Sequence, residues 1–205
     1  MINSLQVAKF LMAAVAVSAL GACEKAEPPA AAPPAATAPS PFKLTAGMQD
    51  IMAHMIDPAA DFLWQSVSST VTAAGVEEKQ PRTDEEWNEV RRQAIILTES
   101  ANLLLMDGRH VAREGKQLED HGTPGNLTAE QAEQAIAADR PTFVAFSQAL
   151  HDAGAAMLKA ADDRSPQGIV DAGETLDQVC EGCHLKFWYP GQKIPAFPTQ
   201  APKPQ

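Results

Sequence analysis

The chain is poor in cysteine, aromatic and basic residues, and it has no long hydrophobic run. Only three of its 205 residues are cysteine, and Phe, Trp and Tyr together make up 5%. Acidic residues outnumber Lys and Arg by 26 to 16, which gives a net charge of −10. Phosphate backbones repel such a chain, so no nucleic-acid partner is expected. Three cysteines also allow no disulfide framework of the kind that small exported domains use.

The first 22 residues have the layout of a secretory signal peptide. Lys9 precedes an apolar run over residues 10–20, which is shorter than the about 20 residues that a membrane-spanning helix needs. The run ends in Leu20-Gly21-Ala22-Cys23, which resembles the lipobox of bacterial lipoproteins. That resemblance implies an exported, periplasmic protein anchored to a membrane by lipid on Cys23. In the alternative, an ordinary secretory signal is cleaved nearby and Cys23 has no role.

Composition divides the chain into four segments. After the signal peptide (1–22), the Pro- and Ala-rich residues 23–43 predict a disordered tether, because prolines exclude both helix and sheet. Residues 44–190 are enough for one folded domain with its own core. Residues 191–205 predict a flexible C-terminal tail.

The apolar residues of the folded domain recur at helical period, and we find no sustained strand-like alternation. The first predicted helix covers about residues 44–71, with a kink or break near Asp57 because Pro58 falls inside it. The second begins with capping-box spacing at Thr83 and has a regular apolar seam that continues to Leu118.

Three further helices are predicted in the C-terminal half. A short helix begins with capping-box spacing at Thr128 and ends near Asp139, and a long one covers about residues 141–161. The last begins with Ser165 as its N-cap and Pro166 at its first position. Long helices with short connections pack as antiparallel neighbours. We therefore expect an all-α domain, an up-and-down four-helix bundle with one short extra helix.

The last predicted helix ends in Cys180-Glu181-Gly182-Cys183-His184. This is C-x-x-C-H, the spacing used for covalent attachment of a c-type haem. On a helix, Cys180 and His184 lie one turn apart with Cys183 between them, so two thiols can meet the haem vinyl groups while the imidazole reaches iron. We therefore expect one covalent haem c on Cys180 and Cys183, with His184 as an axial ligand.

Two other uses of this motif are weighed against the haem. A zinc site would need about four ligands, and no second Cys/His cluster of suitable spacing is present. A dithiol oxidoreductase usually places its C-x-x-C at a strand-to-helix junction, whereas this motif lies near the end of a predicted helix.

A helical bundle with C-x-x-C-H near the end of its last helix resembles the cytochrome c-prime superfamily of bacterial periplasmic haem proteins. The resemblance implies haem attachment at Cys180 and Cys183 with His184 proximal. It also implies that low-spin members take a methionine of the first helix as the second axial ligand, and Met52 best matches that position, ahead of Met55 and Met48. Bundles of this superfamily often pair through their first helices, so a homodimer is also an expectation.

With His184 and Met52 as ligands, we expect a periplasmic one-electron carrier and not an enzyme. The acidic surface would favour a basic-faced redox partner protein. The second hypothesis is a high-spin haem protein that binds nitric oxide or another small gas, in which no methionine reaches iron. The third is a structural or thiol-based lipoprotein without haem.

Overall fold

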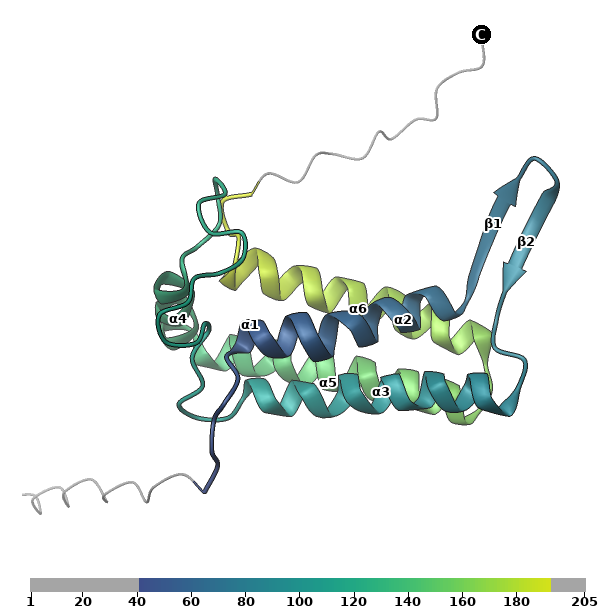
Figure 1. Cartoon of the computed structure of the whole chain (residues 1–205), viewed down its shortest axis with the longest axis horizontal. Coiled ribbons are helices and arrows are strands. Elements are labelled where there is room, and N and C mark those ends of the chain that lie inside the picture. Colours follow the sequence, from purple (N-terminus) through teal and green to yellow (C-terminus); the bar gives the residue numbers. More distant parts are fainter. Residues whose placement is uncertain (1–40, 193–205) are drawn as a thin grey trace, which may run out of the picture. The chain divides into compact units, whose positions relative to one another are not determined.

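The computed structural model describes residues 41–192 (Figure 1). The predicted signal peptide, Cys23, all but the end of the tether and most of the C-terminal tail lie outside the described residues. The described part is mostly helical, as expected. Within it, no helix combines the length and apolar character needed to cross a membrane.

The first helical stretch consists of three elements that follow one another directly: α1 (Met48–Ile51), η1 (Met52–Ile56) and α2 (Asp57–Ser66). It is shorter than predicted at both ends. The expected irregularity before Pro58 is a π-helical turn, in which the Asp57 N–H donates to the carbonyl of Met52, five residues earlier. The wider turn accommodates a proline, which has no N–H to continue the α-helical ladder.

A hairpin follows where the sequence predicted no strand. Strands β1 (Ser68–Thr72) and β2 (Gly75–Lys79) pair antiparallel, with Val71 opposite Val76. Figure 1 shows the hairpin extending away from the helices, and nearly all its residues are exposed. The sequence did not reveal this hairpin, but the described part remains mostly helical, which is compatible with the expected all-α class. The physical reason for the hairpin is local: β1 is rich in β-branched Thr and Val, and Gly75 adopts φ = +129°, which favours a tight reversal.

Helix α3 (Asp84–Leu104) ends 14 residues before the predicted end of its seam. Gly108 and Gly115, which fall on the seam spacing, adopt left-handed φ values of +82° and +71° in the following loop. Glycine reaches such angles without steric cost, so the periodic sequence does not continue as a helix. Leu118 is nevertheless buried in the core, although it belongs to the loop and not to the helix.

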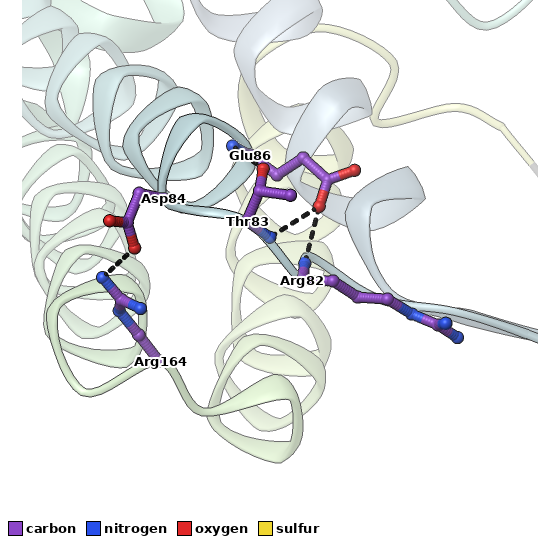
Figure 2. Close-up of polar contacts among 5 residues, drawn as sticks. All are labelled: Arg82, Thr83, Asp84, Glu86 and Arg164. Carbon is purple, nitrogen blue, oxygen red and sulfur yellow. Dashed lines mark hydrogen bonds and ion pairs between the residues drawn. The ribbon is translucent and has the colours of Figure 1, made fainter.

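The helix starts predicted from capping signals are confirmed. Thr83 and Glu86 form the reciprocal capping box of α3 (Figure 2), and Thr128 begins α4 (Ala129–Ala138) in the same way. Helix α5 (Arg140–Asp162) follows directly. Ser165 caps α6 (Pro166–Phe187) by accepting a hydrogen bond from the Gly168 N–H.

The long helices pack against one another around one apolar core. Helix α3 packs against α5, α5 against α6, and α2 against both α3 and α6, and the four lie side by side in Figure 1. Gly154 brings α3 and α5 close together, because a Cβ there would lie 2.5 Å from Thr98 Oγ1 and 3.0 Å from the Thr98 backbone.

Candidate functional site

The C-x-x-C-H motif occupies the C-terminal half of α6. Cys180, Cys183 and His184 are half-buried, and both cysteines are free thiols packed against the core. Positions i, i+3 and i+4 of an α-helix lie on one face. The helix therefore brings the three predicted haem-binding side chains together, as expected from their spacing.

Aromatic residues close the end of the helix around His184. The Trp188 ring meets the imidazole edge-on at 4.8 Å between centroids, and the Tyr189 ring lies 5.8 Å away. Both backbone N–H groups donate to the carbonyl of His184, which ends α6. Trp188 and Tyr189 therefore pack directly against the motif histidine.

These two aromatic residues each donate a hydrogen bond to an acidic side chain. Neither acidic residue was expected at the site from the sequence. The Tyr189 hydroxyl donates to Glu181 Oε2 at 2.7 Å, and the Trp188 indole N–H donates to Asp120 Oδ1 at 3.2 Å. Glu181 lies inside the motif, so its position between the cysteines was a usable signal. Asp120 comes from the loop after α3, and no feature of the sequence connects it with the motif.

The glycine of the motif allows α5 to approach. A Cβ at Gly182 would lie 3.0 Å from Cε1 of Phe146. Phe146 and Phe143 both meet Phe187 edge-on, at 6.4 and 5.6 Å between ring centroids. These aromatic contacts anchor the end of α6 on α5 and fix the direction of the motif.

Burial disfavours the charged forms of the motif side chains. It raises the pKa of the Cys180 thiol to about 11, aided by the negative charges of Asp177 and Asp57, and that of Cys183 to about 12, aided by Cys180. It also lowers the pKa of His184, against the opposing effects of Glu181 and Asp57. Reactive dithiol enzymes instead lower the pKa of their attacking cysteine. A neutral imidazole has a lone pair available to a metal.

The first helical stretch lies near the motif. Asp57, which follows the π-helical turn, acts electrostatically on both Cys180 and His184. Met52 and Met55 are half-buried and pack against the same core as both cysteines, and Met48 is buried. His54 is exposed on this helical stretch.

Two of the remaining histidines pair with acidic side chains at the surface. His110 lies 3.1 Å from Glu133 and His151 lies 3.2 Å from Asp152, and both pairs are solvent-accessible. Among residues 41–192, no group of three or more His, Cys, Asp or Glu side chains could hold a metal ion.

Comparison with known proteins gave no match to a family model, to a curated protein or to a solved structure.

Proposed function

We propose that this protein is a mono-haem c-type cytochrome of the cytochrome c-prime superfamily that acts as a one-electron carrier. The observation that carries the proposal is the C-x-x-C-H motif on one face of the last helix, with two protonated thiols and a neutral imidazole. This donor set fits a c-type haem, which needs two thiols for thioether bonds and one imidazole for iron.

Each proposed ligand has a distinct role. Cys180 and Cys183 would hold the haem covalently, and His184 and Met52 would bind its iron. The haem would supply a couple that gains and loses one electron. The protein would fix the ligands and shield them with Trp188 and Tyr189, which already pack on His184.

The helix contacts support the bundle that this family implies. Helices α2, α3, α5 and α6 form a closed series of neighbours, since α2 packs against α3, α3 against α5, α5 against α6 and α6 against α2. We propose that they form an up-and-down four-helix bundle. Left-handed bundles of this kind bind cofactors with side chains from facing helices.

We also propose that the protein is exported to the periplasm. Covalent attachment of haem c and a lipid on Cys23 both fit a periplasmic protein. A Pro-rich tether of residues 23–43 would give the haem domain reach along a membrane surface.

The decisive experiment is the optical spectrum of the exported protein, oxidised and reduced, with and without carbon monoxide. A low-spin spectrum with a sulfur-to-iron charge-transfer band, unaffected by carbon monoxide, is expected. A high-spin spectrum that shifts with carbon monoxide would replace the electron carrier by the gas-binding alternative. A protein without a Soret band would refute the cytochrome.

Two variants make this experiment specific. Cys180→Ser with Cys183→Ser should abolish covalent haem, seen as loss of haem staining after denaturing electrophoresis. Cys23→Ser is the matched control: it should keep haem and release the protein from the membrane fraction.

A further inference from the structure

A groove between α2 and α6 combines an apolar floor with an acidic rim. It has a volume of about 370 Å³. The indole N–H of Trp64 donates to the Gly173 carbonyl at 3.0 Å, and a Cβ at Gly173 would lie 3.1 Å from Trp64 Cδ1. The tryptophan is thus held in place although 37% of it is exposed. The groove is lined by Leu63, Trp64, Val67, Ile169, Val170, Gly173, Glu174 and Asp177.

Exposed apolar side chains concentrate here and on the adjoining hairpin. Five large hydrophobic residues are exposed in the described part of the chain, and four of them belong to this region: Trp64, Val170, Val71 and Val76. The hairpin begins directly after Val67, which lines the groove. A two-stranded hairpin is at best marginally stable alone in water. Exposed apolar surface next to it therefore favours a partner-binding role.

The charge of the two helical segments that form the groove is strongly one-sided. Helix α2 and residues 166–178 of α6 contain no Lys, Arg or His. No ion pair in residues 41–192 involves their acidic side chains. These side chains are Asp57, Asp61, Asp171, Glu174 and Asp177.

Several acidic residues on the opposite pair of helices, by contrast, form ion pairs with arginine. Asp162 of α5 pairs with Arg91 of α3 at 2.9 Å. Asp84 of α3 pairs with Arg164, which follows α5, at 2.6 Å (Figure 2). The five acidic side chains of α2 and residues 166–178, in contrast, have no cationic partner in the described part of the chain.

The groove also lies close to the motif. Asp177 precedes Cys180 by three residues, which is less than one helical turn or about 4.5 Å of rise. A protein bound in the groove would therefore contact the same helix just before the residues proposed to hold haem.

We propose that the α2–α6 groove and the adjoining hairpin form the docking surface for a protein partner whose apolar patch is surrounded by Lys and Arg. Charge complementarity selects this occupant, because a second copy of the chain would bring the same unpaired carboxylates and be repelled. That the partner exchanges electrons rests on the proposed function, whereas the docking surface itself does not.

Binding is measured with the exported full-length chain in detergent and a fluorescently labelled amphipathic helical peptide of leucine and lysine. The same peptide with glutamate in place of lysine is the negative control. Fluorescence anisotropy at low salt should show binding of the lysine peptide only. Glu174→Lys with Asp177→Lys should weaken binding at least about tenfold. Glu99→Lys with Asp152→Lys makes the same charge change on exposed positions of α3 and α5, and should weaken it far less.

Val170→Glu distinguishes binding at a specific docking surface from nonspecific attraction by the net charge of the protein. It removes an exposed apolar side chain from the groove and adds a negative charge. If the apolar floor contacts the partner, binding weakens, whereas attraction by net charge alone makes binding stronger. Circular dichroism of each variant confirms that it is folded.

Three results would overturn the proposal: no binding by the wild-type chain, equal losses in the two charge-reversal pairs, or stronger binding by Val170→Glu. A dimer of the wild-type chain in analytical ultracentrifugation that Glu174→Lys stabilises would also overturn it, since a second copy would then occupy the groove. The Soret absorbance of each sample reports haem separately. A colourless protein that binds the peptide would refute the proposed function alone, and a haem-loaded protein that does not bind it would refute the docking surface alone.

Discussion

Burial at the end of α6 disfavours the charged forms of all three motif side chains, because it raises the pKa of Cys180 and Cys183 and lowers that of His184. Protonated thiols and a neutral imidazole are unsuited to thiol exchange, which needs a thiolate. They suit a role in which the thiols become thioethers and the imidazole binds metal. The neighbouring Asp57 and Glu181 act against the lowered pKa of His184.

The second axial ligand is the residue-scale question with the sharpest test. Met52→Ala should remove the sulfur-to-iron charge-transfer band and lower the reduction potential, because a thioether ligand stabilises reduced haem iron. Met55→Ala, a change of the same size three residues along the same stretch, is the matched control and should keep the band. The measurement is the oxidised absorption spectrum together with a potentiometric titration.

The reverse pattern would assign the ligand to Met55. A band that survives in Met52→Ala, Met55→Ala and Met48→Ala would exclude methionine ligation by this helix.

At the scale of the element, the capping box of α3 predicts a pH dependence. The Glu86 carboxylate accepts hydrogen bonds from the backbone N–H groups of Arg82 and Thr83, at 2.6 and 2.9 Å, and these bonds lower its pKa (Figure 2). A carboxyl whose pKa is lower in the folded state stabilises the protein above its unfolded value of 4.5. This contribution is lost as the pH falls through the lowered folded value.

Glu86→Gln should therefore flatten the loss of stability below pH 4.5. The test compares thermal unfolding at pH 7 and pH 3 for the wild type, Glu86→Gln and the neighbouring control Glu85→Gln. Equal pH dependence in all three proteins would contradict the assignment.

The contact between α3 and α5 gives a second prediction for an element. Helix propensity alone would make Gly154→Ala stabilising, but the new Cβ would lie within 3.0 Å of the Thr98 backbone. Packing should win, with a loss of about 2 kcal/mol in the free energy of unfolding. Ala156→Gly, on the exposed side of α5, measures propensity alone and should cost about 1 kcal/mol. Urea unfolding of both variants decides, and a more stable Gly154→Ala would refute the close packing.

Local signals predicted the helix starts well and the helix ends poorly. The N-caps Thr83, Thr128 and Ser165 indicate where their helices begin, because a cap involves only the next three residues. Leu104 ends α3 although the apolar spacing continues to Leu118, because spacing does not reveal the backbone angle of an intervening glycine.

Tertiary contacts account for what the sequence did not reveal at the candidate site. The motif residues were predictable because positions i, i+3 and i+4 of a helix lie on one face. The approach of Asp57 and the hydrogen bond from Trp188 to Asp120 depend on how distant segments pack. No periodicity in one segment encodes such contacts.

At the scale of the whole molecule, the hairpin and the helices have separable roles. The hairpin contributes no residue to the buried core, and its first and last residues, Ser68 and Lys79, are paired. Paired strand ends lie about 5 Å apart between Cα atoms. A short Gly-Ser link can therefore replace residues 68–79 without moving α2 or α3.

This replacement should leave haem content and the unfolding midpoint almost unchanged, because no core contact is lost, and should weaken binding of the lysine peptide. A link of the same design in place of residues 114–117, in the exposed part of the loop after α3, is the control and should affect none of the three. Thermal unfolding, the Soret absorbance and peptide anisotropy are measured on the same samples. If the hairpin replacement unfolds the domain, the hairpin belongs to the folding unit. If it leaves peptide binding intact, partner docking depends on the groove without the hairpin.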